Sequence, residues 1–174
     1  MQLDGTHILK ASRDKVWELL MDPDVLANAT PGVKTLELTG EDKYNALLEV
    51  KMGPVSGSFR GKMEVIDKVE PESFVLKMRV NGKIGNVSAE GKLNFAEIAV
   101  GQTEVSFSGA AKLTGTLART GQRVLSGVAK TMTNQFFQSL EEELAKSQGI
   151  AGPPKMGFFA RIKAWFARMF GKKS

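Results

Sequence analysis

The chain has 174 residues, of which 42% are hydrophobic and 25% charged, the usual balance for a globular domain with a sizeable core. It has no cysteine and one histidine, His7, which excludes disulfides, thiolate metal sites, cysteine nucleophiles and histidine clusters. The net charge of +5 is uneven: residues 150–174 hold six basic residues and no acidic one, so residues 1–149 carry 18 basic against 19 acidic residues.

This charge distribution argues against nucleic acid as a partner, because a nucleic-acid-binding domain is expected to carry its basic excess on the folded body. The first residues lack a basic segment followed by an apolar run, so we expect no secretory signal. No stretch reaches the roughly 20 apolar residues of a membrane-spanning helix. The sequence therefore predicts a cytoplasmic protein with a basic appendage.

The N-terminal part predicts a strand followed by two short helices. Residues 2–10 read as the strand, and the Ser12 side chain is placed to cap a helix over 13–21. Asp22 precedes a proline that suits the first turn of a second helix, and the Pro-Gly pair at 31–32 ends that helix.

The middle of the chain predicts six further strands separated by short turns rich in Gly, Pro, Asp and Asn. Such short connections favour an antiparallel meander, which together with the first strand gives a seven-stranded sheet. The predicted segments are 33–39, 43–52, 56–68, 73–83, 86–98 and 102–114.

The spacing of apolar and small residues becomes helical after Thr114-Gly115 and predicts one long helix that reaches about Ser147. This helix is expected to cover the apolar face of the sheet, because no other segment is long enough to do so. Its predicted sheet-facing positions are Leu117, Gly121, Val124, Leu125, Val128, Met132, Gln135, Phe136, Ser139 and Leu140.

The order strand, two short helices, meander and long helix resembles the α+β helix-grip fold of the START/polyketide-cyclase (SRPBCC) superfamily. Within it, the local sequences are similar to the CoxG family of carbon monoxide dehydrogenase. The sequences that carry this resemblance are Lys15-Val16-Trp17, Asp22-Pro23, Thr30-Pro31-Gly32, Lys51-Met52-Gly53-Pro54-Val55, Phe59-Arg60-Gly61-Lys62, Ala129-Lys130 and Asn134-Gln135-Phe136-Phe137.

The resemblance implies a non-catalytic accessory protein of a CO-dehydrogenase-like molybdenum hydroxylase, which recruits that enzyme to the membrane or handles a quinone such as menaquinone or ubiquinone. It implies no tightly bound cofactor. With the Gly- and Pro-rich composition after Ser147, the expected domain organisation is a helix-grip ligand-binding domain over 1–147, a linker over 148–154 and a basic amphipathic tail over 155–174.

Small residues on the predicted inner face of the last strands, with small or flexible residues on the helix opposite, allow either close packing of the two layers or space between them. The family resemblance favours a cavity, whose largely apolar wall suits an apolar ligand. The expected ligand-binding residues are Phe59, Met63, Phe74, Met78, Ala89, Gly91, Phe95, Phe107, Gly109, Val128, Met132 and Phe136.

Catalysis is a weaker interpretation, because it needs a positioned acid or base on the inner face. His7 has no carboxylate partner on its own strand face, and Tyr44 reads more simply as a core residue. The sequence shows no nucleophile–base pair, metal-ligand spacing or phosphate-binding loop. A cyclase- or aromatase-like enzyme that uses His7 or Tyr44 stays as the alternative.

The tail is the most specific local feature. On a helix its large apolar residues fall within an arc of roughly 140°, with basic residues near the edges, as in helices that lie at a membrane interface. A helix over 156–170 would be only about 22 Å long, too short to span a bilayer. The expected membrane-binding residues are Lys155, Phe158, Phe159, Arg161, Ile162, Lys163, Trp165, Phe166, Arg168, Met169, Phe170, Lys172 and Lys173.

Partial immersion of these apolar side chains roughly balances the entropy of ordering the tail, so basic residues on anionic lipid are expected to decide binding. Binding should therefore be weak on neutral lipid, sensitive to salt and peripheral at the inner face of the cell membrane. The same pattern also suits a helix that docks on a partner protein, so a docking adaptor is a third hypothesis.

Overall fold

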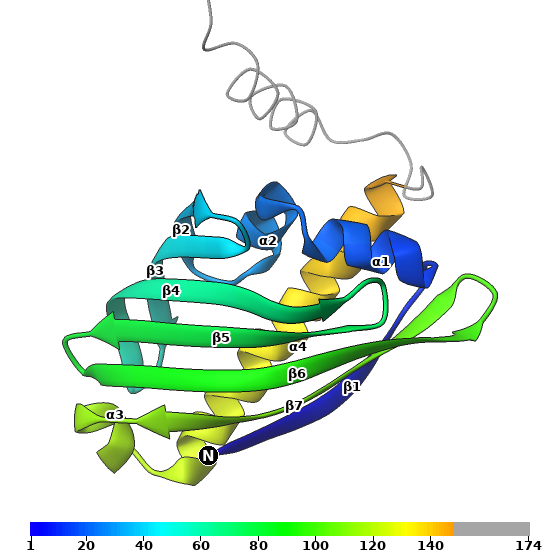
Figure 1. Cartoon of the computed structure of the whole chain (residues 1–174). Helices are drawn as coiled ribbons and strands as arrows, with labels where there is room; N and C mark the ends of the chain where they lie inside the picture. Colours follow the sequence, from blue (N-terminus) through cyan, green and yellow to red (C-terminus); the bar gives the residue numbers. More distant parts are fainter. Residues whose placement is uncertain (148–174) are drawn as a thin grey trace, which may run out of the picture.

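The computed structural model describes residues 1–147. A first strand and two short helices precede a six-stranded meander, and two helices follow it (Figure 1). The elements are β1 (Gln2–Leu9), α1 (Arg13–Leu20), α2 (Pro23–Ala29), β2 (Val33–Gly40), β3 (Lys43–Met52), β4 (Val55–Val69), β5 (Ser73–Gly82), β6 (Gly85–Ala99), β7 (Gln102–Leu113), α3 (Gly115–Arg119) and α4 (Gln122–Ser147).

The seven strands form one antiparallel sheet in the order β1-β7-β6-β5-β4-β3-β2. Strands β2 to β6 each pair with the next strand in the chain, and β1 pairs with β7 at the far edge. The predicted seven-stranded antiparallel sheet is confirmed. The short turns place consecutive strands of the meander side by side, and β1 completes the sheet beside β7. Helix α4 lies across one face of the sheet (Figure 1), as in the helix-grip fold.

Both predicted N-caps are present. The Ser12 hydroxyl accepts a hydrogen bond from the Lys15 backbone N–H at 3.3 Å, and an Asp22 carboxylate oxygen accepts one from the Asp24 N–H at 2.9 Å. These oxygens satisfy N–H groups that have no partner within the first turn of a helix. Local sequence therefore defines where α1 and α2 begin.

The prediction of a single long helix after Gly115 is wrong about where that helix begins. The chain forms the short α3, breaks at Gly121 with a backbone φ of +102°, and begins α4 at Gln122. A glycine adopts this φ without a Cβ clash, which allows the chain to turn between the two helices.

The predicted stripe was extended from Leu117, which belongs to a separate helix. Most of the predicted sheet-facing positions on α4 are buried or half-buried: Leu125, Val128, Met132, Phe136, Ser139 and Leu140. The exceptions are Gly121, which lies at the break and is exposed, and Val124 and Gln135, which are exposed on α4 itself. Phe137, which the prediction left off this face, is only 4% exposed.

The buried apolar side chains divide into two clusters, one near each end of α4. In the cluster at the C-terminal end of α4, Trp17 makes edge-on ring contacts with Phe74 and Phe95 at 5.6 and 5.8 Å between centroids. At the other end, Leu125 and Leu117 pack with residues of β3 and β4. These clusters fix both ends of α4 on the sheet. Within residues 1–147, no helix combines the length and the apolar character needed to cross a membrane.

Candidate functional site

The inner face of the sheet between the two clusters is the candidate ligand site. Met63, Met78 and Ala89 are directly opposite one another across β4, β5 and β6, in one row of inward-facing side chains. On the helix above, Met132 is half-buried. Met78, Ala89 and Met132 belong to neither cluster, and the backbone of α4 comes closest to α2 and β1. The helix therefore leaves apolar surface of the central strands incompletely covered.

Nine of the twelve predicted ligand-binding residues lie between the sheet and α4, on the facing sides of these two layers. They are nevertheless only half-buried. Side chains that pack fully between two layers are normally almost inaccessible, as in the clusters on either side. The nine residues are Met63, Met78, Ala89, Gly91, Phe107, Gly109, Val128, Met132 and Phe136. Four of them also contact a cluster: Met63, Phe107 and Phe136 the one around Trp17, and Val128 the one around Leu125.

The other three predicted residues lie in packed surroundings. Phe74 and Phe95 belong to the cluster around Trp17, and Phe59 belongs to the cluster around Leu125; each is 3–4% exposed. They bound the half-buried region at its two ends. Alternation along the strands predicted their inward orientation but not that neighbouring helices would cover them.

Gly109 is small for a reason that the sequence did not reveal. A Cβ at this position would lie 2.5 Å from the carbonyl oxygen of Glu90 and 2.7 Å from the Cα of Gly91 on the adjacent strand. Glycine here is required by the close approach of β6 and β7. Space for a ligand is therefore indicated by the small Ala89 side chain and the flexible methionines, and not by Gly109.

A group of aromatic rings borders the half-buried region on the β1 and β7 side. The His7 ring stacks on Phe137 with centroids 4.1 Å apart and an interplanar angle of 14°. Phe107 and Phe136 also contact Phe137, at 6.2 and 5.3 Å between centroids. The sequence analysis missed Phe137 as a site residue; its spacing of three and seven from the buried Leu140 and Leu144 is the signal that indicates its position.

The two residues of the catalytic alternative, His7 and Tyr44, both pack against other side chains on the inner side of the sheet. Within residues 1–147, His7 forms no ion pair with a carboxylate, and no group of three or more potential metal-ligating side chains occurs.

Tyr44 is 4% exposed and packs in the cluster around Trp17. Burial is the main cause that raises the pKa of its phenol, and the nearby Asp42 carboxylate adds to the rise. Lys68 donates to Asp42 at 2.7 Å, an interaction that raises the pKa of Lys68.

We expect stability to fall above about pH 10 more steeply in the native chain than in a Tyr44→Phe variant. Because the folded-state pKa of Tyr44 is raised, its contribution is fully present below the ordinary tyrosine value and is lost as pH rises through the folded value. The raised pKa of Lys68 also makes stability fall as pH rises, but it does so in both proteins. Its effect therefore cancels when the two are compared. Melting temperatures from about pH 8 to about pH 11 test this, and parallel curves for the two proteins would contradict it.

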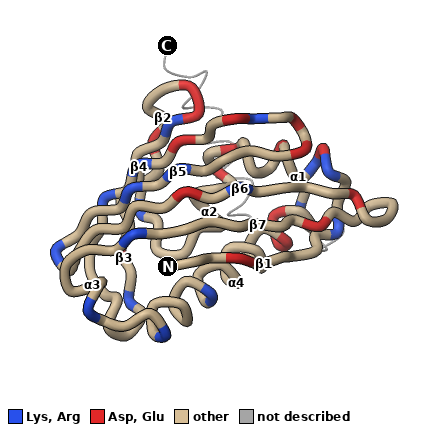
Figure 2. Tube along the Cα trace, turned by 60° about the horizontal axis from the view of Figure 1, so that its bottom comes forward, with Lys and Arg blue, Asp and Glu red and all other residues tan. Residues whose placement is uncertain are grey.

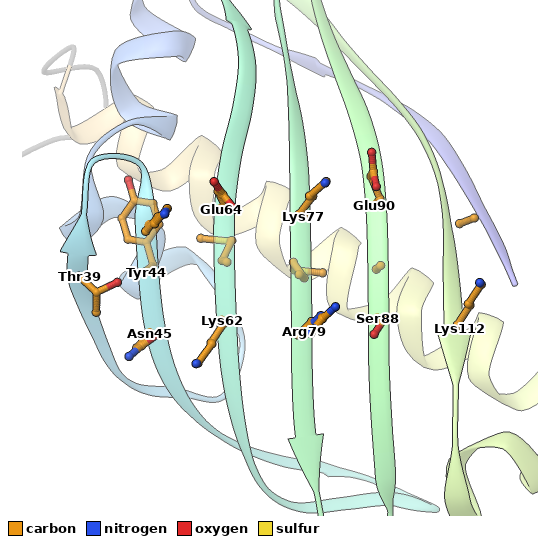
Figure 3. A pocket seen from close by; sticks show the side chains of 15 residues that line it. Thr39, Tyr44, Asn45, Lys62, Glu64, Lys77, Arg79, Ser88, Glu90 and Lys112 are labelled. Carbon is orange, nitrogen blue, oxygen red and sulfur yellow. The ribbon is translucent and has the colours of Figure 1, made fainter.

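The opposite face of the sheet carries a broad hollow of about 800 Å³ that the sequence analysis did not predict (Figure 3). Glu64 of β4 and Glu90 of β6 are among the charged residues that line this hollow. In Figure 3 the charged side chains lie on the side of the sheet away from α4.

The residues proposed for membrane binding, from Lys155 to Lys173, and the linker lie outside the described residues.

Comparisons with known proteins agree with this architecture. The model of the CoxG family, a subunit family of carbon monoxide dehydrogenase, matches residues 5–145. A conserved protein from Geobacillus kaustophilus is similar in structure with a TM-score of 0.83 and 37% identity, covering 84% of this chain and 97% of that one. A START superfamily protein from Mycobacterium smegmatis shares the fold with a TM-score of 0.66 at 10% identity, covering 83% and 97% of the two chains. A search of curated proteins finds no match.

Proposed function

Because the chain belongs to the CoxG family of carbon monoxide dehydrogenase, we propose that it is a non-catalytic accessory protein that binds an apolar ligand between α4 and the sheet. In this proposal the ligand is a quinone, such as menaquinone or ubiquinone, or a similar lipid. The tail brings a CO-dehydrogenase-like molybdenum hydroxylase to the anionic inner face of the cell membrane.

The single observation that carries the ligand proposal is the half-buried apolar surface centred on Met78, Ala89 and Met132, which neither packed cluster includes. A site lined by apolar and flexible side chains selects an apolar ligand. The neighbouring rings of Phe107 and Phe136 offer faces against which a flat ring stacks. A quinone combines such a ring with an apolar chain.

Membrane recruitment is supported by the composition of residues 155–174, which combine aromatic and basic residues without an acidic one. The molybdenum enzyme as partner is supported by the family description alone. The cyclase-like alternative is less well supported, because the His7 ring is stacked on Phe137 and forms no ion pair with a carboxylate within residues 1–147.

The test of the ligand proposal is to purify the intact chain from its own cells without detergent and to extract it with organic solvent. We expect about one apolar molecule for each chain, identified by mass spectrometry and, for a quinone, by its redox-sensitive absorbance. Native mass spectrometry of the same sample measures the stoichiometry. A chain that carries no apolar molecule and takes up neither added menaquinone nor added ubiquinone would refute the proposal.

A further inference from the structure

The outer face of the sheet carries one row of side chains whose charges are not balanced. Lys62, Arg79, Ser88 and Lys112 lie directly opposite one another on β4, β5, β6 and β7, and all four are exposed. We call this set the basic row. Figure 3 shows its side chains beside one another on the face away from α4.

The adjacent row shows what a purely structural arrangement looks like. There Lys77 of β5 lies between Glu64 of β4 and Glu90 of β6, so that opposite charges alternate across the strands. Opposite charges in directly facing positions stabilise a sheet, whereas like charges destabilise it. Lys62 faces Arg79 in the basic row, a pairing that costs stability.

Further basic residues surround the basic row, and none of them is paired within the described part of the chain. Arg60 lies one row further toward α3 and Lys83 lies in the β5–β6 turn. Within residues 1–147, none of Arg60, Lys62, Arg79, Lys83 and Lys112 forms an ion pair. Figure 2 shows Lys and Arg positions gathered over the half of the sheet nearest α3. The surface is therefore ready to bind an anionic group from another molecule.

The shape and composition of this surface favour a protein segment over a membrane. The hollow of about 800 Å³ covers the basic row and its alternating neighbour, and a second hollow of about 460 Å³ lies beside it around Arg60 and Lys83. A flat and uniformly negative bilayer neither enters a hollow nor suits the carboxylates of Glu64 and Glu90. The exposed polar side chains Asn45, Asn81 and Ser88 offer hydrogen-bonding groups that suit a peptide.

We propose that the outer face of the sheet, centred on the basic row, docks an acidic protruding segment of a partner protein. That such a partner protein exists rests on the accessory role proposed above. The outer face lies on the other side of the sheet from the proposed ligand site, so the same chain can hold an apolar ligand and a protein partner together.

The test uses the intact chain and a fluorescent hexaglutamate peptide at low ionic strength, where exposed charges are least screened. The variant Lys62→Gln/Arg79→Gln/Lys112→Gln neutralises the basic row. The control Arg119→Gln/Arg123→Gln/Lys130→Gln removes the same charge from exposed positions on α3 and α4. Both variants keep residues 155–174, so any binding of the peptide to the tail is common to them.

We expect the affinity for the peptide to fall on the order of tenfold in the basic-row variant and to change little in the control. The melting temperature of the basic-row variant should stay equal or rise, because like charges no longer face each other. Equal affinities in the two variants would overturn the proposal. So would a basic-row variant that loses binding to phosphatidylglycerol vesicles but not to the peptide, a result that assigns this face to the membrane.

Ligand occupancy after solvent extraction, measured on both variants, separates this inference from the proposed function. Retained apolar ligand with unchanged peptide binding refutes the docking surface alone. Loss of peptide binding in the basic-row variant supports the docking surface whether or not the chain carries a quinone.

Discussion

Placing two glutamates on the apolar side of the tail is expected to abolish most binding to anionic vesicles. On the helix predicted from the sequence, Ile162 and Phe166 lie near the centre of the apolar arc. Each large apolar side chain contributes about 1.5–3 kcal/mol when fully buried, and about half of that when partly immersed. We therefore expect Ile162→Glu/Phe166→Glu to weaken vesicle binding at least about tenfold.

The matched control is Ala160→Glu/Ala164→Glu, which changes the charge equally but falls on the opposite side of the predicted helix. Flotation with phosphatidylglycerol and phosphatidylcholine vesicles at low and high salt measures binding. The native chain should float only with anionic lipid at low salt, and a chain truncated after residue 152 should not float. Equal loss of vesicle binding in both glutamate variants would show that the added negative charge, and not the lost apolar contact, weakens binding.

If the native chain floats under none of these conditions, the membrane proposal fails. In that case the tail belongs to the docking-adaptor hypothesis, which predicts that a tail peptide ignores vesicles and binds the purified enzyme.

Filling the space next to Ala89 is the second change from which we expect a large effect. In Ala89→Phe the new ring points toward α4, between Met78 and Ala111 of the neighbouring strands. If apolar space exists there, the ring occupies it. We then expect ligand occupancy to fall about tenfold or more, while the melting temperature changes by no more than about 3 °C.

The control is Ser88→Phe, which adds a ring at the next residue of β6, on the exposed outer face. It should keep its ligand occupancy. If the layers are closely packed instead, Ala89→Phe overfills the core at a cost of about 1–3 kcal/mol and the melting temperature drops clearly. Extraction and thermal unfolding on the same preparations distinguish the two cases, and that drop would refute the ligand site.

The sequence by itself determined the strands, their order and the starts of α1 and α2, because these depend on neighbours in the chain. Each predicted strand agrees with the structure within one residue at both ends. Two-residue periodicity, turn residues and cap residues such as Ser12 and Asp22 are local signals, and short connections leave consecutive strands few ways to pair. The ordered local motifs were enough to indicate the family, and the match over residues 5–145 confirms it.

Only the tertiary structure decided which inward-facing residues are covered. Alternation gives Phe95 and Ala89 the same orientation, yet Trp17 covers Phe95 while Ala89 stays half-buried. The division of the predicted long helix into α3 and α4 likewise appeared only with the break at Gly121, and the need for glycine at 109 depended on the approach of β6 to β7. The basic row arises because strand register brings Lys62, Arg79 and Lys112 together, although they are far apart in the chain. Periodicity fixes only the direction of a side chain, whereas coverage and charge balance depend on the neighbours that the folded chain brings to it.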